Sequence, residues 1–208
     1  MIDSKIKAIL FDLGNVMVNF NHMLAARRIA KFTDKTPEGI FNLFFDSALT
    51  ETFEEGKISP QDFFLKVKEA LNLKLGYAEF VPIWNEIFFL SETNRAVYKL
   101  AKTLGKHYPL AMVSNINILH FEYVRDKFPV FDVFSHIITS YQVGARKPKP
   151  LIYQKSIEAL GVSADEIFYT DDRAELVESA KGLGIKGMVF KGSEALKKDL
   201  ESAGVNIN

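Results

Sequence analysis

Five short apolar runs, separated by helical patterns, constrain the fold of this chain more than any other feature of its sequence. They cover residues 8–11, 110–113, 137–138, 167–169 and 188–190. A run without polar alternation is typical of a strand that is covered on both faces in a parallel sheet. Helical patterns between the runs end before a glycine, the usual helix stop, at Gly105, Gly161 and Gly184. This alternation predicts an α/β fold with a doubly wound parallel sheet.

The connection after the first run is too long for a simple crossover between parallel strands. We expect no second strand between residues 15 and 107, and four helical patterns instead: one around residues 24–32, one from Thr36-Pro37 to Ala48, one after Ser59, and one over about residues 77–89. We therefore predict a helical cap over residues 17–92, inserted into an α/β core formed by residues 1–16 and 93–208. Its position favours a lid over the strand ends, where open α/β sheets bind ligands, rather than an extra helical layer.

The charge balance and the absence of cysteine exclude several classes of protein. Lysine plus arginine and aspartate plus glutamate both number 26, so no basic excess suggests a nucleic-acid or anionic membrane partner. Without cysteine the chain has no disulfide, no thiolate metal site and no cysteine nucleophile. No apolar stretch is long enough for a signal-peptide core or a membrane span. We expect a cytoplasmic protein, monomeric by default, that binds neither nucleic acid nor a membrane.

Polar side chains follow three of the apolar runs, and the carboxyl ends of parallel strands meet at one edge of a sheet. These residues are Asp12, then Ser114 and Asn115, then Asp171 and Asp172, while Lys147 lies in a loop that leads into a helix. Crowded carboxylates repel one another unless a cation holds them, and carboxylate oxygens suit Mg²⁺. A nearby lysine keeps a nucleophilic carboxylate ionised and offsets the charge of a transferring phosphoryl group. We therefore expect a magnesium-dependent site at this edge.

Four motifs, in this order, resemble those of the haloacid dehalogenase-like hydrolase superfamily over essentially the whole chain. They read Ile9-Leu10-Phe11-Asp12-Leu13-Gly14-Asn15-Val16, Met112-Val113-Ser114-Asn115, Gly144-Ala145-Arg146-Lys147-Pro148-Lys149-Pro150-Leu151-Ile152-Tyr153 and Ile167-Phe168-Tyr169-Thr170-Asp171-Asp172. The insert resembles the small helical cap of the sugar-phosphatase and dehalogenase-like branches. The form Asp-Leu-Gly-Asn-Val is similar to a subgroup of hexose-phosphate phosphatases. The resemblance implies a Mg²⁺-dependent phosphatase for a small phosphorylated metabolite, with sugar phosphates as one candidate class.

The resemblance also implies a role for each matching residue. Asp12 would be the nucleophile that attacks phosphorus and becomes an aspartyl phosphate, and Lys147 would stabilise charge and bind phosphate. Ser114 and Asn115 would donate hydrogen bonds to phosphate oxygens. The Mg²⁺ ligands would be Asp12, the main-chain carbonyl of Gly14, and Asp172 with Asp171 in support.

Two positions depart from the pattern of these phosphatases. Most of them have a second aspartate, which acts as general acid and base, where this chain has Gly14. General acid catalysis contributes about 10²–10⁴-fold, so we expect a preference for easily expelled groups such as anomeric sugar phosphates, acyl phosphates or aryl phosphates. Leu176 stands where relatives often have Asp or Asn, which weakens the expected surroundings of the metal.

Two other functions stay open at this point. In a 2-haloacid dehalogenase, Asp12 would displace halide without a metal, and Arg27 or Arg28 would bind the substrate carboxylate. The pair Asp171 and Asp172 argues against that function. In a phosphate-binding homologue, the pocket would persist without turnover, as Gly14 and Leu176 suggest.

Aromatic residues of the insert are candidates for a substrate pocket. They are Phe20, Phe41, Phe44 and Phe45, although most phenylalanines are expected in the core. The four histidines are scattered without metal-binding spacing, and among them His22 stands where it can touch substrate.

Overall fold

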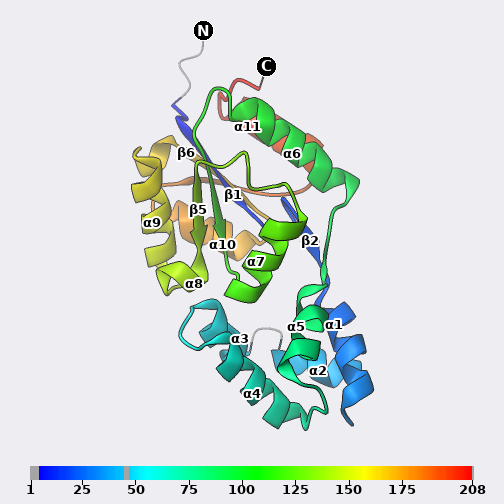
Figure 1. Ribbon diagram of the computed structural model, residues 1–208. Coiled ribbons are helices and arrows are strands. Elements are labelled where there is room, and N and C mark those ends of the chain that lie inside the picture. Colours follow the sequence, from blue (N-terminus) through cyan, green and yellow to red (C-terminus); the bar gives the residue numbers. More distant parts are fainter. Residues whose placement is uncertain (1–4, 45–46, 208) are drawn as a thin grey trace.

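The computed structural model describes residues 5–44 and 47–207 and confirms the doubly wound parallel sheet (Figure 1). The strand order is β5-β4-β1-β6-β7, and every pair is parallel. The strands are β1 (Ala8–Asp12), β4 (Leu110–Ser114), β5 (His136–Thr139), β6 (Ile167–Asp171) and β7 (Lys186–Val189). In the register of the central strand, Phe11 lies between Met112 and Thr170. The last residues of β1, β4 and β6 are therefore neighbours at one edge.

Helices cover both faces of the sheet because successive residues of the central strand point to opposite sides. One face packs Ile9 and Phe11 against α6 (Glu92–Leu104), α7 (Ile118–Lys127) and α11 (Ser193–Ser202). The other face packs Ala8 and Leu10 against α9 (Pro150–Leu160) and α10 (Ala174–Lys181). The short helix α8 (Ser140–Val143) and a 3₁₀ turn, η2 (Ala164–Glu166), complete this part of the chain. Two separate apolar layers thus fix the orientation of the sheet.

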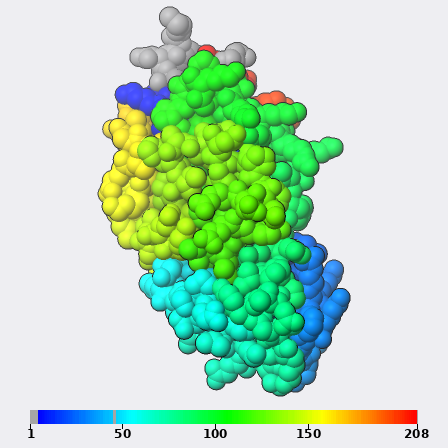
Figure 2. Space-filling view, in the orientation of Figure 1, coloured from blue at the N-terminus to red at the C-terminus, as the bar shows by residue number. Residues whose placement is uncertain are grey.

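The insert is a second lobe of helices below the carboxyl edge of the sheet (Figures 1 and 2). Its helices are α1 (His22–Ile29), α2 (Pro37–Phe44), α3 (Ala48–Glu54), α4 (Pro60–Leu71) and α5 (Tyr77–Asn85), with a 3₁₀ turn, η1 (Ala30–Phe32). Ser59 caps α4 with its side chain, and Pro60 follows at the first helical position, as the sequence pattern predicts. Packed aromatic rings form the centre of this lobe: Phe53 stacks on Phe63 with 4.3 Å between ring centres, and the tilted ring of Trp84 lies 5.0 Å from Phe63.

The insert differs from the sequence prediction in three places. Two short strands, β2 (Asn19–Phe20) and β3 (Phe88–Phe89), pair antiparallel where the chain enters and leaves the lobe, although no strand was expected there. The last helix consequently ends at Asn85 rather than near residue 89. The helix predicted to run to Ala48 ends at Phe44, and Ser47 caps a separate helix, α3, that was not predicted. The side chain of Ser47 caps the start of a new helix, and the spacing of apolar residues alone does not reveal such a break.

The two connections to the insert are tied together by Asn94 of α6. Its buried amide donates to the carbonyl oxygen of Val16 at 3.0 Å and to the side-chain oxygen of Asn19 at 3.1 Å. A polar group that is fully hydrogen-bonded in a buried position holds its partners in one arrangement. The cap boundaries at residues 17 and 92 stay a prediction.

Among the described residues, no helix combines the length and the apolar character needed to cross a lipid bilayer.

His120 connects the two lobes and makes their packing sensitive to acid. Its ring stacks on Trp84 of the insert at 5.2 Å, its Nε2 lies 3.1 Å from the Trp84 carbonyl oxygen, and its Nδ1 lies 3.1 Å from the Asn117 amide. Burial lowers the pKa of His120 from 6.5 to about 3, with the charge of His22 acting in the same direction. The unfolded chain therefore binds a proton between these two values that the folded chain does not.

We expect His120→Gln to flatten the dependence of stability on pH. Because the pKa of His120 is lower in the folded state, its contribution is full above about pH 6.5 and is lost as pH falls toward 3. One such proton corresponds to about 1.4 kcal/mol per pH unit in the free energy of unfolding. Urea unfolding at several pH values measures this slope. The control is His136→Gln, at an exposed position, and an unchanged slope in His120→Gln would contradict the account.

Candidate active site

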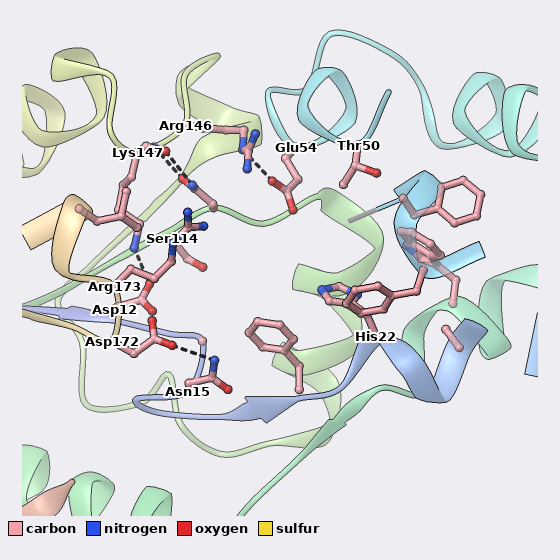
Figure 3. Close-up of a pocket in the computed structure, with 18 of the residues that line it drawn as sticks. Asp12, Asn15, His22, Thr50, Glu54, Ser114, Arg146, Lys147, Asp172 and Arg173 are labelled. Atoms are coloured by element: carbon pink, nitrogen blue, oxygen red, sulfur yellow. Dashed lines mark hydrogen bonds and ion pairs between the residues drawn. The ribbon is translucent and has the colours of Figure 1, made fainter. Parts of the chain in front are cut away.

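Three strands each place a polar side chain at the same edge of the sheet. Asp12, Ser114 and Asp171 are the last residues of β1, β4 and β6, and all three are buried. Asp172 follows β6 directly. Figure 3 shows Asp12, Ser114 and Asp172 together at one end of a pocket, with His22 toward the other end. Parallel strand register therefore brings together residues that are up to 160 positions apart in the sequence, as expected.

Lys147 is the centre of this polar cluster. Its buried ammonium lies 2.6 Å from Oδ1 of Asp12 and 2.6 Å from Oδ2 of Asp171. The side chain of Asn115 holds the main chain of Lys147 in place, because its Oδ1 accepts from the Lys147 N–H at 2.7 Å and its Nδ2 donates to the Lys147 carbonyl oxygen at 2.9 Å. The amide oxygen and one of the two amide N–H groups of Asn115 are therefore engaged by this loop, which leaves the second N–H and the main-chain N–H as its donors.

Three carboxylates of this cluster lie close enough to share one cation. Asp12, Asp171 and Asp172 each offer an oxygen, and these oxygens lie within 4.8 Å of one another. Asn15 donates to Oδ2 of Asp172 at 2.8 Å, and its left-handed backbone, with φ of 56°, turns the chain so that the amide can do so. Lys147 neutralises only one of the three negative charges. An all-oxygen donor set with excess negative charge fits Mg²⁺.

The oxygens of Asp171 already have several partners. Oδ2 accepts from Lys147 and from the hydroxyl of Tyr169, and Oδ1 accepts from the N–H of Arg173 at 2.9 Å. Asp172 is less buried and has the freer approach to a cation, and the division of roles between Asp171 and Asp172 stays a prediction.

Burial and neighbouring charges separate the acidities of these groups. Burial raises the pKa of Asp12 to about 7, with Lys147 opposing and Asp171 and Asp172 reinforcing the shift. Burial alone would raise the pKa of Asp171 too, but the ammonium of Lys147 lowers it below its usual value. Burial also opposes the charge of Lys147, yet Asp12 and Asp171 raise the pKa of this ammonium. Without a cation, Asp12 is thus the carboxylate that takes up a proton near neutral pH.

A side chain at Gly14 would require the ring of Phe20 to shift in this structure. A Cβ atom built there would lie 2.8 Å from a ring carbon of Phe20 and 3.7 Å from Oδ2 of Asp12. The position at which relatives are expected to have a general acid is therefore covered by an aromatic ring. The ring of Phe20 thus fills the space that an acidic side chain at position 14 would need.

The pocket is a cavity of about 390 Å³ between the sheet edge and the insert. Its polar end contains all the predicted site residues, namely Asp12, Gly14, Ser114, Asn115, Lys147, Asp171 and Asp172. The insert contributes mainly apolar side chains, among them Ala26, Ile29, Phe41, Phe44 and Trp84. Of the residues proposed for the substrate pocket, Phe20, His22, Phe41 and Phe44 line it, and Phe45 lies outside the described residues.

Two candidates for carboxylate binding lie elsewhere. Arg28 forms an ion pair with Glu86 at 3.1 Å, and neither Arg27 nor Arg28 is among the described residues that line the cavity. Leu176, which was expected to weaken the surroundings of the metal, lines the cavity. Asn15 supplies a hydrogen bond to Asp172 instead.

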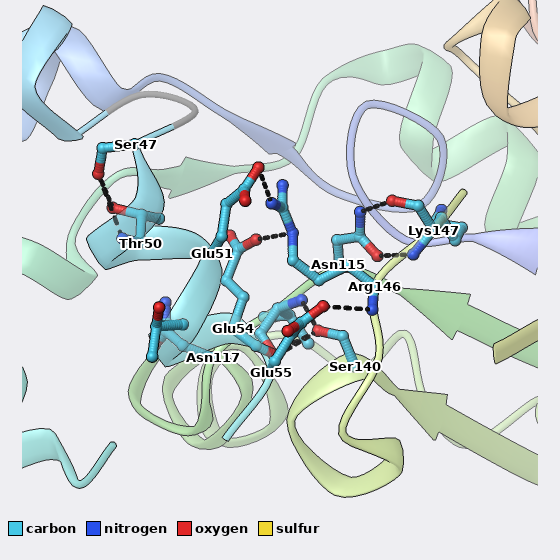
Figure 4. Close-up of polar contacts among 12 residues, drawn as sticks. Ser47, Thr50, Glu51, Glu54, Glu55, Asn115, Asn117, Ser140, Arg146 and Lys147 are labelled. Carbon is cyan, nitrogen blue, oxygen red and sulfur yellow. Dashed lines mark hydrogen bonds and ion pairs between the residues drawn. The ribbon is translucent and has the colours of Figure 1, made fainter. Parts of the chain in front are cut away.

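A charged contact between the lobes was not predicted from the sequence. Arg146, next to Lys147, forms ion pairs with Glu51 at 2.7 Å and Glu54 at 2.8 Å on α3 (Figure 4). Lys149 pairs with Glu55, whose carboxylate also accepts from the Arg146 N–H at 3.4 Å. The Ser140 hydroxyl donates to the Glu54 carbonyl oxygen at 2.6 Å. Helix α3 is therefore fastened to the loop that positions Lys147.

We expect Arg146→Gln to destabilise the protein by about 1–3 kcal/mol, because it leaves the mostly buried Glu54 carboxylate without its cation. Urea unfolding measures the loss. The matched control is Lys155→Gln, which breaks an exposed pair with Glu158 and should cost less than about 1 kcal/mol. Equal effects of the two substitutions would contradict this assignment.

Comparisons with known proteins agree with this geometry. A family model described as "Hydrolase: haloacid dehalogenase-like hydrolase" matches residues 6–184. The chain is 25% identical to a sesquiterpene phosphatase of Aspergillus oryzae, over 93% of this chain and 94% of that protein. It is also 25% identical to a D-ribitol-5-phosphate phosphatase of Bacteroides thetaiotaomicron, over 87% of this chain and 90% of that protein.

Solved structures show the same likeness. A HAD family enzyme from Bacteroides thetaiotaomicron matches with a TM-score of 0.81 and 25% identity, over 93% of this chain and 97% of that chain. Another structure of that enzyme, in complex with magnesium and inorganic phosphate, matches with a TM-score of 0.78 and 27% identity, over 89% of this chain and 94% of that chain. The likeness covers the sheet and the inserted helices together.

Proposed function

The chain belongs to the haloacid dehalogenase-like hydrolases, and from this premise we propose a Mg²⁺-dependent phosphatase that hydrolyses a small phosphorylated metabolite through an aspartyl phosphate on Asp12. The observation that carries this proposal is the meeting of Asp12, Asp171 and Asp172, with the ammonium of Lys147 in contact with the first two. A nucleophilic carboxylate, a fixed positive charge and an oxygen-rich cation site are the groups that phosphoryl transfer requires.

The reaction assigns one task to each residue. A carboxylate oxygen of Asp12 forms a bond to phosphorus. The bond between phosphorus and the leaving oxygen breaks, and its electron pair stays on that oxygen. Lys147 offsets the negative charge that spreads over the phosphoryl oxygens, and Ser114 with the main chain of Asn115 donates hydrogen bonds to them. Water then attacks phosphorus, releases inorganic phosphate and restores Asp12.

The same residues fit the metal. Asp12, Asp172 and the carbonyl of Gly14 would hold Mg²⁺, with Asp171 in support. When bound, the ion neutralises excess carboxylate and phosphate charge and orients the phosphoryl group. Asn15 keeps the carboxylate of Asp172 oriented by its hydrogen bond, and Lys147 does the same for Asp171.

The relatives support this reaction class. Proteins whose names state phosphatase activity on a sesquiterpene or on D-ribitol 5-phosphate are similar along most of their length. The magnesium and phosphate in the neighbouring structure support both the cofactor and the bound group. Sugar phosphates, acyl phosphates and aryl phosphates are the classes that Gly14 leaves as substrates. A monomeric state, a cytoplasmic location and the absence of nucleic-acid and membrane partners also stay predictions.

Release of inorganic phosphate with and without Mg²⁺ tests the proposal. A screen over sugar, nucleotide, acyl and aryl phosphates is expected to show turnover that chelator abolishes. Halide release from a 2-haloacid in the presence of chelator would instead indicate a dehalogenase. Formation of phosphoenzyme without further turnover would indicate a phosphate-binding homologue.

We expect Asp172→Ala to raise the Mg²⁺ concentration for half-maximal rate by about 10–100-fold, because a cation ligand is lost. A titration of rate against Mg²⁺ measures the shift. The control is Asp199→Ala, outside the cavity lining, with an unchanged midpoint. An unchanged midpoint and rate in Asp172→Ala would show that this ligand is wrongly assigned.

A further inference from the structure

We infer that the leaving group of the substrate is an aromatic, largely apolar group, so that the enzyme hydrolyses aryl phosphates in preference to sugar phosphates or small acyl phosphates. This inference rests on the proposed function and selects one of the leaving-group classes that Gly14 allows. Two observations carry it: the apolar lining contributed by the insert, and the ring of Phe20 at the position of Gly14.

The part of the cavity that faces the insert offers few hydrogen bonds. Its lining includes Ala25, Ala26, Ile29, Ile40, Phe41, Phe44 and Trp84. The indole nitrogen of Trp84 is itself covered, so this ring presents carbon. A ligand group in this region leaves water for apolar contact, which favours hydrocarbon and disfavours hydroxyl groups.

The polar side chains that the described insert adds to the cavity are His22, Thr50 and Glu54. Glu54 forms its ion pair with Arg146, and Thr50 accepts a hydrogen bond from Ser47 at 3.2 Å. A sugar has a hydroxyl group on nearly every carbon, and each one needs a partner when it is buried. Three polar side chains do not supply that number.

The ring of Phe20, at the position of Gly14, also favours an aromatic leaving group over a sugar. It occupies the space into which a side chain at position 14 would extend, and a Cβ atom in that space would also lie 3.7 Å from Oδ2 of Asp12. A leaving oxygen that departs there receives no proton from position 14, and its substituent contacts an aromatic ring. A phenolate departs without an acid far more readily than the alkoxide of a non-anomeric sugar hydroxyl, because a phenol, with a pKa of about 10, is much more acidic than an aliphatic alcohol.

The size of the cavity agrees with this class. A volume of about 390 Å³ lies at the lower end of the range for small-molecule sites. It accommodates a phosphate with one or two aromatic rings, and aromatic pairs add edge-to-face contacts to simple burial. A small acyl phosphate would leave the apolar part of the cavity empty.

In the reaction, Asp12 forms its bond to phosphorus as the bond from phosphorus to the phenolic oxygen breaks. The electron pair stays on that oxygen, and the resulting phenolate takes a proton from water. Hydrolysis of the aspartyl phosphate by a second water gives inorganic phosphate. No oxidant, reductant or further reactant is needed.

Non-hydrolysable phosphonates test the inference without relying on turnover. Calorimetry with Mg²⁺ compares benzylphosphonate, methylphosphonate and 2,3-dihydroxypropylphosphonate. Burial of the ring predicts that benzylphosphonate binds at least about tenfold more tightly than either of the others. Equal affinities, or tighter binding of the dihydroxypropyl compound, would overturn the inference.

Two variants on one helix provide a matched pair. Phe41→Gln replaces a ring that lines the cavity, whereas Leu43→Gln changes an exposed side chain of α2 outside the cavity lining. Phe41→Gln is expected to remove most of the preference for benzylphosphonate, while Leu43→Gln retains it. A second variant, Ala26→Leu, fills the cavity and should weaken benzylphosphonate binding while leaving methylphosphonate unchanged. Retention of the full preference in both cavity variants would contradict the inference.

Rates on phenyl phosphate, glucose 1-phosphate and acetyl phosphate separate this inference from the proposed function. Aryl-selective binding without hydrolysis of any of the three would refute the proposed function, and with it aryl phosphate hydrolysis, and would leave only a pocket that prefers an aromatic group. Magnesium-dependent hydrolysis without an aryl preference in rate or binding would support the proposed function and refute the inference.

Discussion

Asp12→Asn is expected to abolish phosphatase activity, with kcat lowered by about 10⁴-fold or more. An amide of nearly the same shape has no charged oxygen with which to attack phosphorus, and loss of an enzyme's nucleophile commonly costs this much or more. The fold should persist, because the substitution removes one of three crowded carboxylates and Lys147 keeps its contact with Asp171. Phosphate release and urea unfolding together measure the two effects.

The control for this substitution is Asp165→Asn, which changes an exposed carboxylate paired with Lys5. It should leave both kcat and the free energy of unfolding nearly unchanged. If Asp12→Asn retained more than a few per cent of the activity, Asp12 would not be the nucleophile. If Asp12→Asn unfolded the protein, the expectation that removal of one crowded carboxylate preserves the fold would be wrong.

Lys147→Met is expected to have the second-largest effect, on both rate and stability. Removal of a preorganised positive group typically lowers kcat by about 10²–10³-fold. It also leaves Asp12 and Asp171 buried without their cation, which costs about 3–5 kcal/mol for a broken buried pair. Because the pKa of Asp12 is already about 7, the stability loss should be smaller below that pH, where this carboxyl takes up a proton.

Urea unfolding of Lys147→Met with chelator and with Mg²⁺ checks the electrostatic origin of the loss. Added Mg²⁺ should recover part of the stability, since it neutralises the same carboxylates. The control is Lys155→Met, where an exposed lysine pairs with an exposed Glu158 and a cost below about 1 kcal/mol is expected. A variant of Lys147 that is as stable as the unaltered protein in chelator would contradict the proposed charge balance.

The sheet and its carboxyl edge could be predicted from the sequence because each depends on a local pattern. Ala8–Asp12 and Ile167–Asp171 are apolar runs that end in a carboxylate, and parallel pairing then makes Asp12 and Asp171 neighbours. Lys147 lies in a loop without regular structure, so no strand end placed it; it was expected at this edge because its loop leads into a helix and because a lysine suits a cluster of carboxylates, and the resemblance to a family added its role. Ser114 is likewise the last residue of an apolar strand, so its place at the same edge could also be predicted.

The features missed in the sequence depend on contacts between distant segments. The strands β2 and β3 have two residues each, too few for an alternating pattern to be visible. Helix α3 has a polar sequence, and its glutamates gain a role only through Arg146 of another lobe. The contact between Phe20 and Gly14 arises because the chain turns back at Asn15, whose left-handed backbone is a conformation that asparagine tolerates. The local indication of this turn in the sequence was the asparagine that follows Asp-Leu-Gly at the end of the strand.

The most direct test of the account is a search for phosphoryl transfer to Asp12. The protein is mixed with acetyl phosphate and Mg²⁺, quenched in acid within milliseconds and digested for mass spectrometry. Since Gly14 provides no general base for the second step, the aspartyl phosphate should accumulate, and one phosphoryl group should appear on the peptide that contains Asp12. It should be absent with chelator and in Asp12→Asn. Turnover without any labelled Asp12, or a phosphoryl group on a different residue, would contradict the account.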